Sequence, residues 1–248
     1  MTNQYWDEVQ ELKSIIDKSK NIVFLGGAGV STESGIPDFR SAKGLYSKGS
    51  FIENSPEYML SRRFFDENTA GFYEYYKDNM LYSKAKPNKA HTALKELEVM
   101  GKLSAVITQN IDGLHQAAGS KTVYELHGSV YRNYCMTCNE SYSLDFIQKS
   151  QGIPLCEKCK GTVKPDVVLY GEGLDTKVLE AAINAVAGAD TLIVGGTSLE
   201  VNPAASLVEY FSGKNLVIIN MSQTKYDEYS SLIIKAPIGE VLSSVLGL

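Results

Sequence analysis

The stretch NIVFLGGAGVSTESGIPDFR, residues 21–40, decides how the rest of the chain is interpreted. It opens with a short apolar run, ends that run at glycine and then turns polar. Such a run predicts a buried strand followed by a turn. The same pattern recurs at 103–110, 190–196 and 215–220, with helical patterns at 91–100 and 176–189. Buried strands that alternate with helices predict an α/β fold, with a Rossmann-like parallel sheet covered by helices on both faces.

Composition and charge exclude several classes of protein. The chain has 248 residues, of which 44% are hydrophobic, and a formal net charge of -5. This length suits a large domain with an inserted module, and the acidic balance argues against a direct nucleic-acid partner. The first residues contain no apolar leader segment, and no run approaches the roughly 18 apolar residues of a membrane span. We therefore expect a cytoplasmic protein without a membrane partner.

Four cysteines form the most specific pattern in the chain. Cys135 and Cys138 make one C-x-x-C pair, and Cys156 and Cys159 make another. A two-residue gap lets two thiolates of one tight turn bind one ion, and two such pairs complete a tetrahedral zinc site with no open position. A disulfide pair is disfavoured in a reducing compartment, and this spacing suits an iron–sulfur cluster less well. The pattern predicts one structural zinc ion.

The cysteines lie in one of two stretches that interrupt the alternation of strands and helices. Residues 131–162 contain them, and residues 41–86 are rich in Tyr, Phe and charged residues, with helical patterns and no convincing strand. We expect a smaller domain made of a zinc-ribbon module at 131–162 and a helical insertion at 41–86. The Rossmann-like domain would then comprise residues 1–40, 87–130 and 163–248.

The glycine spacing in the opening stretch argues against hydride transfer. The fingerprint of a dehydrogenase is G-x-G-x-x-G, followed by an acidic residue roughly 20 positions later. Gly27 and Gly29 fit this pattern, but Thr32 stands at the third glycine position. Glycines at a strand end, with Ser31 and Thr32 available to cap a helix, are suited to a pyrophosphate at a helix N-terminus. The stretch predicts that a dinucleotide binds without serving as a hydride carrier.

Polar residues follow other predicted strands, at the edge where α/β sheets bind ligands. Thr197 and Ser198 follow one strand, either as ligand-facing hydroxyls or as ordinary capping residues of a strand-to-helix turn. Gln109, Asn110 and Asp112 lie at the end of another strand. These groups predict a polar site that several strand ends share.

Three histidines are the candidates for a general base near neutral pH. His91 stands at a predicted helix start, where capping or packing is the better interpretation. His115 and His127 both lie in or near the polar stretches, and spacing alone does not separate them.

A set of motifs spans residues 22–220 of the chain. In chain order they are GAGVSTESGIPDFR, TQNIDGLH, LHGS, the two C-x-x-C pairs, KPDVVLYGE, GTSLEVNPA and VIIN. Together they resemble the sirtuins, a family of NAD-dependent protein-lysine deacylases. The resemblance implies a reaction that consumes NAD, passes the acyl group of a lysine side chain to ADP-ribose, and releases nicotinamide, O-acetyl-ADP-ribose and free lysine.

The resemblance also implies roles for individual positions. His127 matches the catalytic histidine of the family, and Cys135, Cys138, Cys156 and Cys159 match its zinc ligands. The positions that match the NAD site are Ala28, Thr32, Phe39 and Arg40 in the cofactor loop, Gln109, Asn110, Ile111 and Asp112 around the nicotinamide and its ribose, His127, and Thr197, Ser198, Asn220 and Ile238 on the adenosine side.

The substrates follow from the same resemblance. It implies that an acyl-lysine peptide binds as an added strand near Val168–Gly173 and Ser198–Asn202. The succinyl-removing branch of the family has Tyr and Arg three residues apart after the cofactor loop. Tyr46 has no arginine at that spacing, so we expect neutral acyl groups, although Arg62 and Arg63 offer a cation from elsewhere.

Three other functions compete with deacylation. ADP-ribosyl transfer would use the same NAD site, and the presence of His127 argues mildly against it. A non-enzymatic zinc-ribbon binding module would leave the NAD motifs unexplained. A nicotinamide dehydrogenase is opposed by the missing third glycine.

Overall fold

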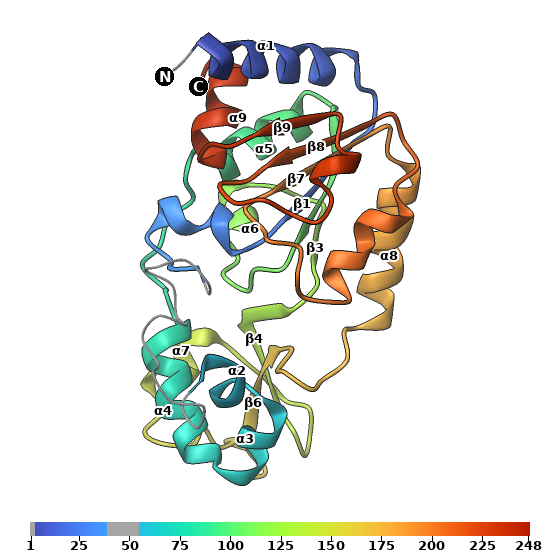
Figure 1. The fold of residues 1–248 in the computed structure, drawn as a ribbon. Coiled ribbons are helices and arrows are strands. Elements are labelled where there is room, and N and C mark those ends of the chain that lie inside the picture. Colours follow the sequence, from blue (N-terminus) through green and yellow to red (C-terminus); the bar gives the residue numbers. More distant parts are fainter. Residues whose placement is uncertain (1–2, 39–54) are drawn as a thin grey trace.

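The computed structural model describes residues 3–38 and 55–248, which form two lobes (Figure 1). A cavity lies between the lobes. The upper lobe in the figure is built on a six-stranded sheet and the lower lobe on a three-stranded sheet. We call them the larger lobe and the smaller lobe. Each is assembled from segments that are far apart in the sequence.

All strands of the larger sheet are parallel, in the order β3-β2-β1-β7-β8-β9. Their bounds are β1 Ile22–Gly26, β2 Leu103–Thr108, β3 Val123–Glu125, β7 Thr191–Gly195, β8 Asn215–Ile219 and β9 Leu232–Ile234. β1 and β7 are buried along their whole length, as expected of parallel strands with helices on both faces. The strand order reverses direction at β1, and ligands bind at such a point in open sheets.

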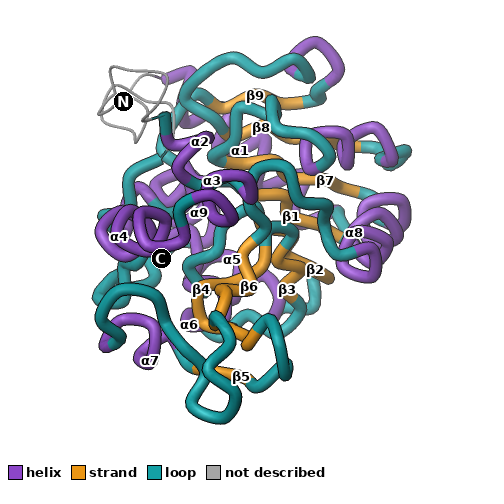
Figure 2. The backbone as a smooth tube through the Cα atoms, turned by 90° about the horizontal axis from the view of Figure 1, so that it is seen from below, coloured by secondary structure: helices purple, strands orange, loops and turns teal. Residues whose placement is uncertain are grey.

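Helices cover both faces of the larger sheet, and Figure 2 shows α8 on one side of the strands and α5 and α9 on the other. The helices are α1 Asn3–Lys18, α5 Lys89–Val99, α6 Leu114–Ala118, α8 Thr176–Gly188 and α9 Ile238–Leu246. Leu12 of α1, Leu94 of α5 and Leu242 of α9 share one apolar core. Val186 of α8 belongs to the core on the opposite face, together with the 3-10 helix η5, Ala204–Tyr210. The predicted Rossmann-like fold is confirmed.

Two strands of this sheet are not evident in the sequence patterns. β3 and β9 have 3 residues each and lie at the two edges of the sheet. A run of this length is too short to show a period. Their pairing with β2 and β8 therefore depends on neighbours that only the folded chain supplies.

The smaller lobe combines the helical insertion with the cysteine-rich stretch, as predicted. Its elements are α2 Pro56–Met59, α3 Arg62–Glu67, α4 Thr69–Met80, β4 Gly128–Cys135, β5 Ser141–Tyr142, α7 Leu144–Lys149 and β6 Val163–Val167. The strands form an antiparallel sheet in the order β5-β4-β6. Phe72 and Tyr76 of α4, Val130 of β4 and the cysteines Cys135 and Cys156 share one buried core. The two stretches therefore stabilise each other.

The smaller sheet begins earlier and ends later than the cysteine-rich stretch. β4 pairs with β6 from Gly128 opposite Val167 to Cys135 opposite Val163. Residues 128–130 and 163–167, which the expected division places in the Rossmann-like domain, form strands of the smaller sheet. Backbone hydrogen bonds between β4 and β6 extend the sheet beyond the zinc module, which spacing between cysteines does not reveal.

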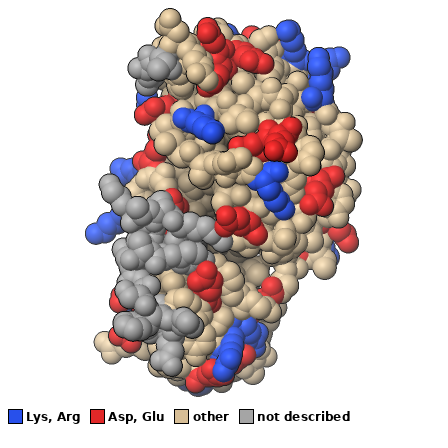
Figure 3. All heavy atoms as spheres, in the orientation of Figure 1, with Lys and Arg blue, Asp and Glu red and all other residues tan. Residues whose placement is uncertain are grey.

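Charge on the surface is mixed. On the face shown in Figure 3, acidic and basic side chains lie interspersed, which is unlike the single-sign surface that binds nucleic acid. Among residues 3–38 and 55–248, no helix combines the length and the apolar character needed to cross a bilayer.

Candidate active site

A cavity of about 820 Å³ lies between the lobes, where β1, β2, β7 and β8 end. The smaller lobe contributes Leu60, Tyr76 and Met80 to its lining. Every described residue that the sequence assigns to the NAD site also lines it, namely Ala28, Thr32, Gln109, Asn110, Ile111, Asp112, His127, Thr197, Ser198, Asn220 and Ile238. Phe39, Arg40 and Tyr46 lie outside the described residues. Tertiary folding thus brings distant motifs to one cavity.

The loop after β1 differs from the expected helix start. Ala28–Val30 and Thr32–Ser34 form two 3-10 turns, and no α-helix follows within residues 27–38. The Ser31 hydroxyl does not cap a helix but donates to Asp112 Oδ2 over 2.6 Å, and it accepts from Asn110 Nδ2 over 3.0 Å. A hydrogen bond to a carboxylate is stronger than one between neutral groups. The loop is therefore held by the end of β2.

The two glycine loops are in direct backbone contact. Gly29 N donates to Gly196 O over 2.8 Å. A Cβ on Gly196 would lie 2.5 Å from Val30 N, and the φ of Gly196 is 60°. Both the short approach and the left-handed backbone require glycine at Gly196. Gly196 thus serves the packing of one glycine loop on the other.

Thr197 and Gln109 connect two strand ends at the cavity wall. Gln109 Nε2 donates to Thr197 Oγ1 over 3.1 Å, and the same oxygen accepts from Leu199 N over 3.2 Å. Gln109 N also donates to Gly26 O over 3.0 Å. Gln109 is therefore fixed between β1 and β7. The Ser198 hydroxyl, by contrast, has no hydrogen bond to another residue of the described part of the chain.

His127 faces the cavity and has one defined ring partner. Its Nδ1 lies 2.9 Å from Gln109 O, and because a carbonyl oxygen only accepts, Nδ1 carries the proton. Burial lowers the pKa of His127 below its ordinary value, although the bond to Gln109 opposes this. The ring is therefore neutral near pH 7, with the lone pair on Nε2. Such a nitrogen can accept a proton.

His91 and His115 are buried away from the cavity. His91 Nδ1 accepts from Asn88 N over 3.2 Å in a capping box at the start of α5, so the capping interpretation is confirmed. Neither ring nitrogen of His115 has a hydrogen-bond partner among the described residues. Burial lowers the pKa of His91 to about 4 and that of His115 to about 3. The structure thus separates His127 from His115, as the family resemblance did and spacing alone did not.

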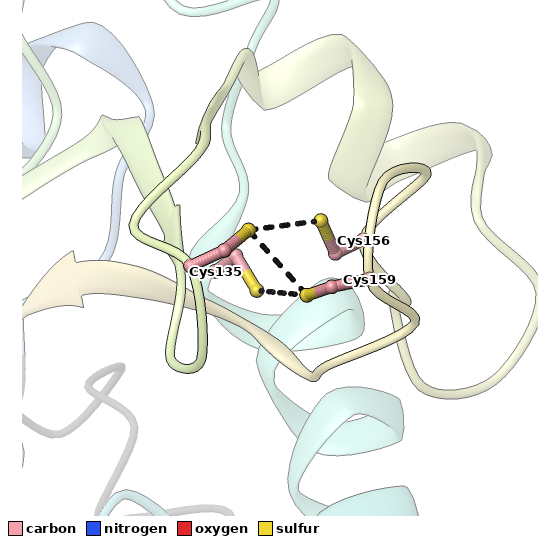
Figure 4. A group of neighbouring side chains, drawn as sticks. Cys135, Cys156 and Cys159 are labelled. Carbon is pink, nitrogen blue, oxygen red and sulfur yellow. Dashed lines mark hydrogen bonds between the residues drawn. The ribbon is translucent and has the colours of Figure 1, made fainter.

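The four cysteines form a candidate metal centre in the smaller lobe. Their Sγ atoms all lie within 4.8 Å of one another, and none is in a disulfide. Figure 4 shows the sulfur atoms of Cys135, Cys156 and Cys159 directed into the same space between two loops. The Tyr142 hydroxyl donates to Cys156 Sγ over 3.2 Å. Four thiolates at this spacing fit a tetrahedral zinc ion that has no vacancy for water.

Comparison with known proteins agrees with this geometry. Residues 27–203 match the model of the Sir2 family. The chain belongs to the Sir2 family. Two relatives called NAD-dependent protein deacetylase come from Clostridium acetobutylicum, 55% identical over 97% of this chain and 98% of the relative, and from Clostridium perfringens, 57% identical over 97% and 99%.

Solved Sir2 structures have the same fold. One holds a deacetylated p53 peptide and 3′-O-acetyl ADP-ribose, with 39% identity, a TM-score of 0.89 and coverage of 96% of this chain and 97% of that one. A second holds a p53 peptide and NAD+, with 39% identity, a TM-score of 0.86 and the same coverage. The two-lobed architecture is therefore that of the Sir2 family.

The cavity of this Sir2-family chain fits a dinucleotide. Amide side chains of Gln109, Asn110 and Asn220 line it together with the Ser198 hydroxyl, and such groups hydrogen-bond ribose and carboxamide. The described part of the lining contains no Lys or Arg. Backbone N–H groups of the glycine loops are suited to hold phosphate oxygens.

Hydrogen bonds from two residues, Asn88 and Gly239, to the loop after β1 were not predicted. Asn88 Nδ2 donates to Val30 O over 2.8 Å and to Ser34 Oγ over 3.0 Å. Gly239 N donates to Glu33 Oε2 over 2.8 Å. Asn88 lies at the start of α5 and Gly239 near the start of α9. No local sequence pattern predicts either partner.

Proposed function

We propose that this chain, an NAD-dependent protein deacetylase, moves the acyl group of an acyl-lysine peptide to ADP-ribose within the cavity between the lobes. The products are nicotinamide, O-acetyl-ADP-ribose and free lysine. The observation that carries the proposal is the convergence of the glycine loops, the end of β2 and His127 on one cavity in a chain of the Sir2 family.

The NAD site comprises the cavity residues that sequence motifs single out. Ala28 and Thr32, with Phe39 and Arg40 from outside the described residues, form the cofactor loop. Gln109, Asn110, Ile111 and Asp112 surround the nicotinamide and its ribose, and Thr197, Ser198, Asn220 and Ile238 bind the adenosine half. When bound, NAD supplies the ADP-ribose that accepts the acyl group. The contacts of Ser31 with Asn110 and Asp112 support this assignment, because they join the loop to the nicotinamide side.

His127 is the general base. The Gln109 carbonyl holds the Nδ1 proton and orients the ring, so Nε2 takes a proton from a hydroxyl group of the bound substrates. Burial, which lowers the pKa of His127, keeps the ring neutral in the pH range where a base is needed.

The acyl-lysine peptide binds as an added strand between Val168–Gly173 and Ser198–Asn202. Support comes from the cavity lining, which contains residues of both segments. Strand addition takes its affinity from main-chain hydrogen bonds and reads little of the peptide sequence. The acyl group is neutral; support comes from the ion pairs of Arg62 with Asp66 and Glu172 and of Arg63 with Glu67, which engage both candidate cations.

Zinc bound by the four cysteines is structural and holds the smaller lobe together. We also propose a division into the two lobes as functional units, one for NAD and one that closes the site. A cytoplasmic location is part of the proposal, because free thiols and zinc thiolates persist in a reducing compartment.

The test is incubation of the protein with NAD and an acetyl-lysine peptide, followed by mass spectrometry. We expect equal amounts of nicotinamide, deacetylated peptide and O-acetyl-ADP-ribose. ADP-ribosylated protein with an unchanged acetyl-peptide would contradict the proposal and favour ADP-ribosyl transfer. Binding of peptide without any consumption of NAD would favour a binding module.

A further inference from the structure

Backbone hydrogen bonds hold the segment Val168–Gly173 to two other parts of the molecule. Val168 N donates to His127 O over 3.0 Å, which joins the segment to the proposed base. Tyr170 N donates to Leu60 O over 3.0 Å, and Arg62 N donates to Tyr170 O over 2.9 Å. These bonds occupy both backbone groups of Tyr170 with the connection between α2 and α3. The rest of the segment must keep its shape by other means.

The carboxylate of Glu172 holds the rest of the segment in shape. Its Oε2 accepts from Leu169 N over 2.9 Å and from Lys164 Nζ over 3.2 Å. Its Oε1 accepts from Arg62 Nη1 over 3.3 Å. Glu172 N also donates to Leu169 O over 2.9 Å. The side chain therefore closes a turn over 169–172 and fastens that turn to β6 and to α3.

The pair of Glu172 and Lys164 is shielded from water. The side chains are 20% and 16% exposed, whereas Arg62 is 42% exposed. Screening by solvent is weaker for such a pair than for ions at the surface. Lys164 Nζ also donates to Pro165 O and Val167 O. Loss of the Glu172 charge would leave the ammonium group with carbonyl partners only, which is unfavourable at low exposure.

We infer that Glu172 is a positioning residue that preforms the peptide-docking segment, acting through Lys164 and Arg62. A segment already ordered in its binding conformation loses less entropy when the peptide adds to it. The inference rests on the proposed docking of peptide at Val168–Gly173. It also places Arg62 in the scaffold of the segment, where its charge is neutralised by Asp66 and Glu172.

The test compares two substrates of the variant Glu172→Gln. One is an acetyl-lysine peptide, and the other is a single acetyl-lysine with blocked ends, whose backbone is too short to add as a strand. Glutamine keeps the size of the side chain and an oxygen that can accept from Leu169 N, but lacks the charge. We expect the KM for the peptide to rise about tenfold, since hydrogen bonds to a charged group are lost. The KM for NAD and the kcat/KM for blocked acetyl-lysine should stay within about twofold.

Asp66→Asn is the matched control, because it removes the other carboxylate from Arg62 and keeps every contact of Glu172. Its KM for the peptide should be unchanged. Arg62→Gln removes the ion pair between Arg62 and Glu172. The fold should be kept, because the Arg62 side chain is exposed. We expect about a threefold rise in KM for the peptide. If Glu172→Gln fails to fold, the KM of Arg62→Gln for the peptide tests the inference instead.

Equal losses on the peptide and on blocked acetyl-lysine would overturn the inference, and so would an unchanged KM for the peptide. Calorimetric titration of the acetyl-peptide without NAD gives a second measurement, in which Glu172→Gln should weaken Kd by a similar factor. If the unaltered protein binds the peptide but releases no nicotinamide, the proposed function fails. The ratio of the peptide Kd of Glu172→Gln to that of the unaltered protein still tests the role of Glu172.

Discussion

The two lobes are stabilised in different ways. The larger lobe has a continuous sheet whose central strand, Ile22–Gly26, is buried at every position. The smaller lobe has a core that joins residues of α4 and β4 to two of the four clustered cysteines. Apolar burial suffices for a sheet with helices on both faces. The smaller lobe adds a metal centre, as small cores commonly do. Because of this difference, we expect the two lobes to unfold under different treatments.

Removal of zinc should have the largest effect, and only on the smaller lobe. Structural zinc contributes roughly 10 kcal/mol or more to the folding of small metal domains. A chelator, or Cys156→Ser, should remove hydrogen-exchange protection from β4, β6 and α4 and leave β1, β2 and β7 protected. Mass-spectrometric hydrogen exchange measures this.

The matched control is Ser141→Ala, an exposed position on the neighbouring strand β5, which should leave the protection of both lobes unchanged. Uniform loss of protection in the two lobes after chelation would show that they do not differ in this way.

His127→Asn tests the junction of the lobes. We expect kcat to fall roughly 100- to 10,000-fold, because general-base catalysis contributes about that factor. Thermal unfolding should change little, since His127 makes one ring hydrogen bond at the cavity wall.

We expect His115→Gln to have the opposite effect to His127→Asn, because the His115 ring is buried in the larger lobe and does not line the cavity. It should lower stability and preserve kcat. A variant of His127 with full activity would contradict the assignment of the base.

Acid should weaken the larger lobe through His91 and His115. Their folded pKa values are about 4 and about 3 because of burial, against 6.5 for an ordinary histidine. The unfolded state therefore binds more protons in this window, and the free energy of unfolding falls as pH decreases from 6.5 towards 4. The slope is roughly 1.4 kcal/mol per pH unit for each histidine. Denaturant titrations across the window measure it.

The variant His115→Leu should show a flatter dependence of stability on pH than the unaltered protein, because one of the two buried histidines is gone. Identical slopes in the two proteins would refute the role of this histidine in acid sensitivity.

Gly196→Ala should have a smaller effect than zinc removal, His127→Asn or acid. We expect it to weaken the binding of NAD. Its Cβ would meet Val30 N at 2.5 Å, so the glycine loops must separate. We expect NAD to bind about tenfold more weakly, a loss of about 1.4 kcal/mol. Isothermal titration calorimetry gives the affinity.

Gly152→Ala is the matched control for Gly196→Ala. It has the same sign of φ, 63°, but no atom within 4 Å of the added Cβ. It should lower stability slightly and leave NAD affinity unchanged. Equal effects of the two substitutions would mean that backbone strain, and not the contact between loops, matters.

Local patterns in the sequence predicted much of the fold and of the site. The apolar runs that end at glycine became β1 and β7, and the C-x-x-C pairs came together as one cluster. The resemblance carried by the motifs selected the described cavity residues. Local patterns did not predict the 3-10 turns after β1, because their geometry follows from Ser31 and Asn88 bonding to distant residues.

By itself, the sequence determined the alternation of strands and helices, the spacing of the metal ligands and the rejection of hydride transfer at Thr32. These depend on residues a few positions apart, whose geometry the backbone restricts. The tertiary structure decided the burial of each histidine, and it alone showed which carboxylate holds the segment Val168–Gly173. Burial of His115 and pairing of Glu172 with Lys164 and Arg62 arise from contacts between separate elements of the fold. Such contacts set solvation and charge, which no local spacing encodes.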